Sequence, residues 1–303
     1  MNEPILMPLR NVVHVDEILA TTSAHRIIAA DCYVAGAESW TPHSWGWEQT
    51  LNGRTIINVD HHADDARFFR NVSSGNLAIE YLKTREVDAK TAVVINHTDC
   101  DSVISSAILC GILEPADRYA NAVIAADHTG EPDPIADLLQ ALDPARGFAM
   151  SIRNLRLMES CKAIEPSAQR LLDKRHADRD IAERLVKTGA FERIRRVAVA
   201  TLPLEQRVPG EFLPSLLGDR VWAIISGTPM QGNTNLWEIK IRLGAGAPAG
   251  TNLFSMGVQK AEPKFGGRWN AGSTKRAGGS SDAPREVALR LSELLAGYLV
   301  PIS

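Results

Sequence analysis

Four short apolar segments in the first half of the chain each end in an acidic residue or a histidine. The segments are residues 26–30, 55–59, 92–96 and 121–126. The residues that follow them directly are Asp31, Asp60, His97 and Asp127. Runs of apolar residues bounded by polar ones are typical of strands that are buried on both faces of a parallel sheet. Ligands of open α/β sheets bind at the carboxyl ends of such strands, so the pattern predicts a site there.

Helical patterns separate and follow these predicted strands. They cover residues 15–20, 73–82, 103–113, 135–142, 151–164 and 167–186. Alternation of strand and helix predicts a parallel α/β domain. Residues 33–53 contain three of the six tryptophans, and Pro42, Gly46 and Gly53 disfavour a regular helix. We interpret them as a loop whose aromatic rings cover one end of the sheet, or as an aromatic wall against a substrate ring.

The pattern changes near residues 187–196. Strand-like runs at 197–202, 221–225 and 237–243 are followed by a glycine-rich segment at 265–281 and an amphipathic helix at 283–298. We predict two domains: an α/β domain over residues 1–188 with a metal site, and a smaller α+β domain over residues 195–303 that binds substrate.

Composition narrows the class of protein. The 303 residues carry a formal net charge of −3, which argues against coating a long nucleic acid but leaves a short nucleotide possible. No apolar stretch has the length of a membrane span, and the start of the chain lacks the pattern of a signal peptide. The 4 cysteines form no C-x-x-C pair, so we expect a reduced, cytoplasmic protein. A homodimer is compatible with the sequence, which does not determine the oligomeric state.

The third segment is followed by alternating ligand-type residues. His97, Asp99 and Asp101 would point the same way in an extended chain. His61, Asp31, Asp60 and Asp127 would join them from neighbouring strands. Each of these residues alone has a structural interpretation, such as an aspartate that caps a helix or a histidine on the surface. Together they predict a cation site, because clustered carboxylates repel one another unless a cation neutralises them.

The mixture of oxygen and imidazole ligands suits Mn²⁺, with Mg²⁺, Co²⁺ or Zn²⁺ as alternatives. The set is large enough for two ions that share one aspartate. Two ions about 3.5–4 Å apart form a site for phosphoryl transfer. The ions generate hydroxide at neutral pH and stabilise the attacking and leaving oxygens.

The same residues resemble the motifs of the DHH phosphoesterase superfamily. Asp60-His61-His62 follows an apolar strand as the Asp-His-His motif does, and Asn71-Val72-Ser73-Ser74 resembles the segment after it. His97 to Ser102 resembles the His-x-Asp-x-Asp motif. The stretch Phe265-Gly266-Gly267-Arg268-Trp269-Asn270-Ala271-Gly272 resembles the glycine loop of the DHH-associated substrate domain. The resemblance reaches most of the chain, and the combination of motifs is more specific than the three-letter motif alone.

Two departures from the family pattern stand out. The His-x-Asp-x-Asp motif usually comes first in the chain, but here it follows Asp60-His61-His62, as if one strand had moved inward along the sequence. Arg268 stands where the family usually has histidine. Arginine can bind a phosphate or carboxylate with two hydrogen bonds, but it does not act as a general acid at neutral pH. We therefore expect the departure at Arg268 to change the choice of substrate more than the binding of metal.

The resemblance implies a role for each residue. His97, Asp99 and Asp31 would hold one ion, and Asp101, Asp31, His61 and Asp127 the other. Asp31 would bridge the ions, although the sequence leaves this role exchangeable with Asp127. Asp60 would support the site, and His62 would contact the phosphoryl group or protonate the leaving oxygen. The expected substrate-binding residues are Arg242, Gly266, Gly267 and Arg268. Lys275 or Arg276 could also bind substrate, but for these two residues we favour a solvated position on the surface. His128 is either an outer-sphere residue or a bystander.

The sequence therefore predicts a hydrolase with two metal ions, acting on a small phosphate ester such as a nucleotide, a dinucleotide or a very short oligonucleotide. Hydroxide bound to the metal would attack phosphorus. One alternative is an inorganic pyrophosphatase of the same superfamily. Others are a nucleotide-binding regulator without activity and a metal-assisted hydrolase of a different bond.

Overall fold

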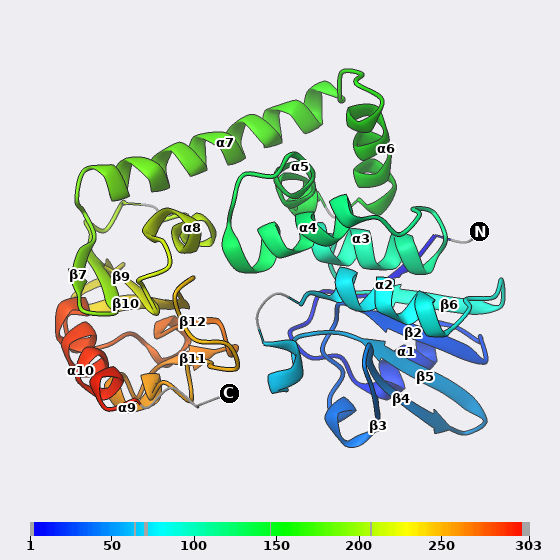
Figure 1. Cartoon of the computed structure of the whole chain (residues 1–303), viewed down its shortest axis with the longest axis horizontal. Coiled ribbons are helices and arrows are strands. Elements are labelled where there is room, and N and C mark those ends of the chain that lie inside the picture. Colours follow the sequence, from blue (N-terminus) through cyan, green and yellow to red (C-terminus); the bar gives the residue numbers. More distant parts are fainter. Residues whose placement is uncertain (1–2, 64, 70–71, 146, 207, 299–303) are drawn as a thin grey trace. The chain divides into compact units, whose positions relative to one another are not determined.

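The computed structural model describes residues 3–298 except residues 64, 70, 71, 146 and 207. Asn71, one residue of the motif resemblance, therefore lies outside the described residues. The chain divides into two compact units (Figure 1), and each is described by itself. The first unit is Met1–Asp127 with Pro132–His176, and the second is His128–Glu131 with Ala177–Ser303. The predicted α/β class is confirmed.

The first unit is built on a six-stranded mixed sheet with the order β1-β6-β2-β5-β4-β3. The strands are β1 (Ile5–Leu6), β6 (Thr91–Ile95), β2 (Arg26–Ala30), β5 (Arg54–Val59), β4 (Gly46–Leu51) and β3 (Thr41–His43). The four strands from β1 to β5 in this order run parallel, and β4 and β3 run antiparallel to their neighbours. Ile27, Ile28, Ile56 and Ile57 are fully buried, as expected for strands covered on both faces.

The strand order resolves the unusual order of motifs in the sequence. β2 lies between β6 and β5. β2 ends before Asp31, β5 ends before Asp60, and β6 ends before residues 97–102, which we call the His97 segment. Ala30 pairs with Val59 and Ala29 pairs with Val94, so the three strands end at the same edge. A late position in the chain therefore does not separate the His97 segment from the other two.

The segment at 33–53 is more regular than expected. It contains β3 and β4, which form an antiparallel hairpin, where the sequence analysis predicted a loop. Trp45 and Trp47 are almost completely buried in the core, with 2% and 1% of their surface exposed. Because these rings fill the core, they form no wall against a substrate.

The helices of the first unit are α1 (Val15–Thr21), α2 (Ser74–Thr84), α3 (Cys100–Leu109), α4 (Asp117–Ile124), α5 (Pro134–Leu142), α6 (Phe148–Glu159) and α7 (Pro166–Lys187). α7 continues into the second unit, so the boundary between the units falls inside this helix rather than in the predicted stretch between residues 188 and 195. α3 begins earlier than predicted because Asp99 caps it by accepting a bond from the Ser102 N–H. Every residue of α3 is buried.

The predicted strand at residues 121–126 is wrong. Residues 117–124 form α4, and Ala125–Thr129 continue as a π-helical turn. The segment is rich in alanine, the strongest helix former, and its buried residues Tyr119, Ala122 and Val123 have helical spacing. Asp127 therefore lies on a helical turn and not at the end of a strand.

The second unit contains a separate six-stranded sheet with the order β11-β12-β10-β9-β8-β7. Its strands are β7 (Glu192–Ile194), β8 (Val197–Thr201), β9 (Ala223–Met230), β10 (Asn233–Leu243), β11 (Gly266–Gly267) and β12 (Ala271–Ser273). Its short helices are α8 (Leu213–Leu217) and α9 (Val258–Ala261), and α10 (Pro284–Ala296) packs against β8 and β9. Gly227 is required there, because a Cβ atom would lie only 2.0 Å from Pro284 Cγ.

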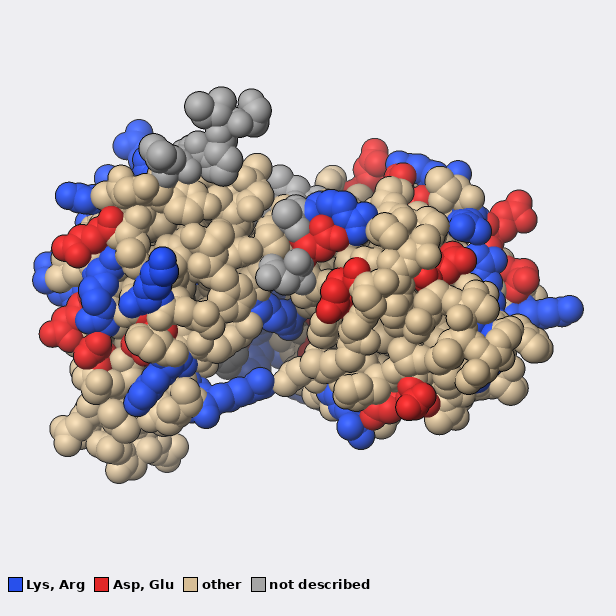
Figure 2. Space-filling view, turned by 90° about the horizontal axis from the view of Figure 1, so that it is seen from below, with Lys and Arg blue, Asp and Glu red and all other residues tan. Residues whose placement is uncertain are grey.

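The hydropathy of the described helices and the charges on one face bear on the kind of partner that the protein can bind. Among the described residues, no helix combines the length and apolar character that a membrane span needs. On the face drawn in Figure 2, basic and acidic side chains are interspersed over both units. This distribution agrees with the small net charge of −3.

Candidate metal centre

The predicted ligands of the first unit come together at the carboxyl edge of its parallel strands. Asp31 follows β2, Asp60-His61-His62 follows β5, and the His97 segment follows β6. Asp101 lies in the first turn of α3, and Asp127 lies on the turn after α4. Two groups of these side chains have ligand atoms within 4.8 Å of one another and could hold a metal ion: Asp31 with His61 and His62, and Asp31 with His97 and Asp99.

Asp31 is the residue that the two groups share. Its Oδ2 atom lies 3.1 Å from His97 Nε2. Its Oδ1 atom lies 3.6 Å from His62 Nδ1 and 3.9 Å from His61 Nε2. One oxygen therefore faces each group, which is the arrangement that a bridging carboxylate needs.

The backbone of Asp31 is held in an unusual conformation. Its φ of +50° lies in the left-handed region, which costs energy for residues other than glycine. The Asp31 N–H donates to the Val59 carbonyl at 2.9 Å. The buried amide of Asn58 donates to the carbonyls of Ala29 and Cys32, on either side of Asp31. The end of β5 therefore fixes the position of the shared carboxylate.

His97 is oriented by its neighbour in sequence. His97 Nδ1 lies 2.6 Å from Asn96 Oδ1, and the Asn96 amide donates to the Arg10 carbonyl at 2.8 Å. This leaves His97 Nε2 facing Asp31 and Asp99, with Asp99 Oδ2 at 3.4 Å. A ligand histidine held through its other ring nitrogen is a usual feature of metal sites.

His61, Asp101 and Asp127 form the other side of the cluster. His61 Nε2 lies 3.3 Å from Asp127 Oδ2 and 3.5 Å from Asp101 Oδ2. Both oxygens of the fully buried Asp101 also accept backbone N–H bonds, from Ser74 at 2.7 Å and from Gly75 at 2.6 Å. The free N–H groups at the start of α2 therefore stabilise one carboxylate of the cluster.

His62 and Asp60 form a hydrogen-bonded pair. His62 Nδ1 lies 2.6 Å from Asp60 Oδ1, and the His62 N–H donates to Asp60 Oδ2 at 3.0 Å. Asp60 is completely buried, whereas 13% of the His62 side chain is exposed. Asp60 thus orients the ring, which stays partly exposed.

The cluster shifts the pKa of its members in opposite directions. Burial, together with the charges of Asp31, Asp127 and Asp99, raises the pKa of Asp101 well above its usual range. Burial also opposes ionisation of Asp31, but the imidazoles of His97, His62 and His61 outweigh it and hold the pKa of that carboxyl far below its usual range. Burial lowers the pKa of His97, but Asp99 and Asp31 outweigh it and raise that pKa to about 12.

These shifts describe a group of carboxylates that needs positive charge nearby. The raised pKa values of His97 and His61 have this cause, and a divalent cation could supply the positive charge in place of protons. The donor set contains only carboxylate oxygens and imidazole nitrogens, which fits Mn²⁺ and similar ions. The residues present therefore fit the expected metal.

The sequence analysis treated the outer residues of this cluster mainly as parts of the fold. Ser73 is the N-cap residue of α2, and Ser74 is the first residue of that helix. In addition, Ser74 Oγ donates to Asp31 Oδ1 at 3.0 Å and Ser73 Oγ lies 3.2 Å from Asp127 Oδ2. Asn58 and Asn96 were assigned no role. Their position, on or directly after an apolar strand that leads to a ligand, was the available signal.

The predicted substrate residues lie in the second unit. Arg242 is half-buried on β10, where it pairs with Ala271 of β12. Gly266 and Gly267 form β11, and Arg268 is exposed in the turn to β12, with its N–H bonded to the Ala271 carbonyl at 2.8 Å. Lys275 Nζ lies 3.8 Å from Glu238. The His128 ring lies 5.8 Å from the Trp269 ring, and its role stays open.

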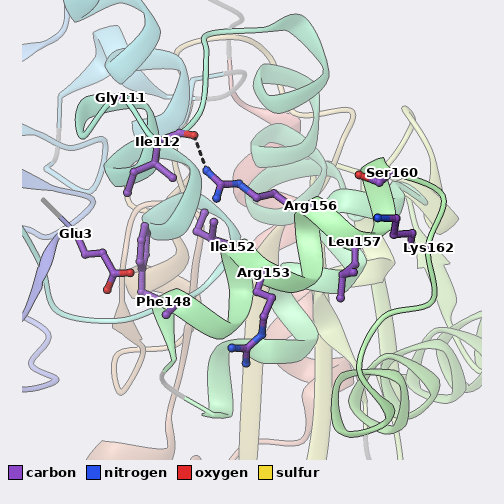
Figure 3. Close-up of a pocket in the computed structure, with 11 residues that line it drawn as sticks. Glu3, Gly111, Ile112, Phe148, Ile152, Arg153, Arg156, Leu157, Ser160 and Lys162 are labelled. Atoms are coloured by element: carbon purple, nitrogen blue, oxygen red, sulfur yellow. Dashed lines mark hydrogen bonds between the residues drawn. The ribbon is translucent and has the colours of Figure 1, made fainter. Parts of the chain in front are cut away.

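A pocket in the first unit involves none of the predicted ligands. It is lined by residues of α6 and by Gly111 and Ile112 after α3. Both arginines that line it have partners: Arg153 Nε lies 2.6 Å from Glu165, and Arg156 donates to the Ile112 carbonyl at 3.2 Å (Figure 3). We therefore assign this pocket no part in the chemistry of the metal centre.

Comparison with known proteins finds similarity in structure only. No family model and no curated protein matches the sequence. A pGpG-specific phosphodiesterase, PggH from Vibrio cholerae, matches with 11% identity and a TM-score of 0.44 over 70% of this chain and 82% of its own. The manganese-bound exonuclease RecJ matches with 12% identity and a TM-score of 0.37 over 95% of this chain and 78% of its own. Both belong to the DHH superfamily, which the sequence motifs resemble.

Proposed function

We propose that this chain is a metal-dependent phosphohydrolase that acts on a small phosphate ester. The observation that carries the proposal is the position of Asp31, whose two oxygens face two different groups of ligand-type side chains. A carboxylate shared in this way suits a pair of ions. A pair of divalent cations would supply Lewis-acid activation of water and of the phosphoryl group.

The side chains of the site have separate roles in this proposal. His97, Asp99 and Asp31 hold one ion, and His61, Asp101, Asp127 and Asp31 hold the other. Burial of Asp31 and Asp101 strengthens their interaction with a cation, because little water competes for their oxygens. The N–H groups of Ser74 and Gly75 keep Asp101 in place without taking part in the reaction.

His62 is suited to handling a proton on the leaving group. Its Nδ1 faces Asp60, so Nε2 is the nitrogen that can give a proton to a departing oxygen. Asp60 keeps the ring in one orientation. Loss of Asp60 would therefore affect turnover through His62 more than metal binding.

The net charge and the distribution of charged side chains favour a short substrate over a long polyanion. On the face drawn in Figure 2, basic and acidic side chains are interspersed, and the net charge of −3 does not favour a long polyanion. A nucleotide, a dinucleotide or a very short oligonucleotide fits better. Arg242 and Arg268 of the second unit are the residues that we propose to bind the rest of such a substrate.

The test is hydrolysis of a panel of mononucleotides, bisphosphates, dinucleotides and pyrophosphate, with Mn²⁺ and with a chelator, read by chromatography of the products, because cleavage of a phosphodiester yields a shorter nucleotide and no inorganic phosphate. Wild type is compared with His97→Ala and with His25→Ala, in which an exposed histidine away from the cluster is removed. We expect His97→Ala to lose at least about 100-fold in activity, more than loss of an outer residue would cost. His25→Ala should behave as wild type.

The panel also separates the alternative functions. Preference for pyrophosphate would identify an inorganic pyrophosphatase. Tight binding of metal without turnover of any phosphate ester would contradict the proposal and favour a nucleotide-binding regulator or hydrolysis of a different bond. Equal activity with metal and with chelator would contradict a metal-dependent reaction.

A further inference from the structure

We propose that Ser74 is a positioning residue that holds the Asp31 carboxylate in the orientation needed to bridge two ions. The inference rests on the proposed metal centre but assigns a role that the motifs do not specify. Ser74 is fully buried, and its hydroxyl donates to Asp31 Oδ1 at 3.0 Å. Its backbone N–H donates to Asp101 Oδ2 at 2.7 Å. One residue at the start of α2 therefore contacts two predicted ligands.

The bond to Oδ1 matters because a carboxylate rotates easily about its last torsion. A bridging carboxylate must present one oxygen to each ion. In this structure, Asp31 Oδ2 faces His97 at 3.1 Å, while Oδ1 faces His62 at 3.6 Å and His61 at 3.9 Å. The hydrogen bond from Ser74 to Oδ1 favours the rotation in which Oδ2 faces His97.

The backbone of Asp31 is fixed independently of Ser74. Asn58 binds the carbonyls on both sides of Asp31, and the Asp31 N–H is bonded to Val59. Removal of the Ser74 hydroxyl should therefore leave Asp31 in place but free its carboxylate to rotate. The expected defect is loss of the shared ligand, with each separate ligand retained.

Ser73 offers a weaker case for the same role. Its hydroxyl lies 3.2 Å from Asp127 Oδ2 and 3.4 Å from the Val123 carbonyl, so one proton has two possible acceptors. Asp127 is also 17% exposed, whereas Asp31 is 1% exposed. Ser74 is therefore the sharper test of positioning.

The experiment is a titration of the metal-free protein with Mn²⁺. Calorimetry measures the affinity for each ion, and electron paramagnetic resonance detects coupling between the ions. Two Mn²⁺ ions that share a carboxylate give an exchange-coupled signal, which differs from that of isolated Mn²⁺. Ser74→Ala should bind the second ion about 10–100-fold more weakly than wild type. It should therefore lose the coupled signal at a Mn²⁺ concentration that just fills both sites of wild type. Ser106→Ala is the matched control, because Ser106 is a buried helical serine whose hydroxyl donates to the Ser102 and Val103 carbonyls of its own helix.

A second variant keeps the proposal testable if Ser74→Ala does not fold. Ser74→Cys preserves the volume and replaces the hydroxyl by a weak donor, and Mn²⁺ has little preference for sulfur. It should show an intermediate loss of affinity for the second ion. Folding of each variant is checked by circular dichroism in the absence of metal.

The possible results are distinct for the two proposals. Unchanged affinity for both ions and an unchanged coupled signal in folded Ser74→Ala or Ser74→Cys would overturn the positioning role. If wild type binds two coupled ions but hydrolyses no phosphate ester, the proposed function fails while the role of Ser74 is still decided by the titration. If wild type binds no Mn²⁺, both proposals fail.

Discussion

Single side chains in this protein serve the fold and the candidate site at the same time, and Asp99 is the clearest case. Its Oδ1 atom caps α3 by accepting the Ser102 N–H at 3.0 Å, and its Oδ2 atom lies 3.4 Å from His97 Nε2. The two oxygens therefore have different roles. A substitution that keeps one role and removes the other separates stability from metal binding.

Asp99→Asn should retain the cap, because asparagine caps helices as well as aspartate does. Its metal affinity should fall because a charged ligand is lost. Asp99→Ala should lose metal affinity as well and, without metal, should be about 1 kcal/mol less stable than Asp99→Asn, because both variants lose the charge beside His97 but only alanine loses the cap. Urea denaturation and Mn²⁺ titration measure the two effects.

Asp133 provides the control for the Asp99 variants. It caps α5 by accepting the N–H groups of Ile135 and Ala136 at 2.9 and 2.8 Å, and it lies in neither ligand group. Asp133→Ala should lose about 1 kcal/mol of stability without a change in metal affinity. Equal losses of affinity in the Asp99 and Asp133 variants would show that the effect is indirect.

Between elements, polar side chains at helix ends connect one helix to the next. At the junction of α6 and α7, the Glu165 N–H donates to Asn154 Oδ1 at 2.8 Å, and Arg153 Nε lies 2.6 Å from Glu165 Oε1. The Asn154 amide and the Arg153 guanidinium lower the pKa of Glu165 below its usual value. The junction should therefore depend on pH.

A carboxyl whose pKa is lower in the folded state contributes stability above its unfolded pKa and loses it as the pH falls through the folded pKa. We therefore expect Glu165→Gln to have a lower melting temperature than wild type at neutral pH. The difference should shrink as the pH falls below the usual pKa of a glutamate, about 4.3, and disappear once Glu165 is also protonated in the folded state. Melting curves from acidic to neutral pH, with chelator present, measure it. Glu86→Gln, which changes an exposed glutamate between α2 and β6, is the control, and a melting-temperature difference for Glu165→Gln that persists in acid would contradict the ionic origin.

On the scale of the whole molecule, all the predicted ligands lie in one of the two compact units. Asp31 to Asp127 belong to the first unit, and the sheet with β10 and β11 belongs to the second. Each unit has buried apolar residues of its own, such as Ile56 in the first and Leu213 in the second. Metal should therefore stabilise one unit and leave the other unchanged.

Differential scanning calorimetry should resolve two transitions, of which Mn²⁺ raises one. Metal at 100 times its dissociation constant adds about 2.7 kcal/mol, which corresponds to roughly 5–10 °C for a unit of this size. Leu213→Ala should lower only the other transition, by about 2–5 kcal/mol in stability. A single transition that moves with both metal and Leu213→Ala would contradict independent units.

The sequence by itself determined the α/β class, most of the helices and the strands that carry the ligands, because these depend on local periodicity. Ile27, Ile28, Ile56 and Ile57 mark buried strands in any sheet that covers both faces. The expectation for residues 121–126 was wrong because a short apolar run fits a strand and a helix equally well. Only burial of Tyr119, Ala122 and Val123 on one face distinguishes the helix.

The tertiary structure alone decided which strands are neighbours. Strand order is a property of long-range pairing, and the late position of the His97 segment in the chain did not reveal that β6 lies next to β2. It also decided the outer contacts, such as Ser74 to Asp31, since 43 residues of chain separate these two side chains. Ligand types are visible in the sequence, but the groups that orient them are ordinary serines and asparagines until the fold brings them together.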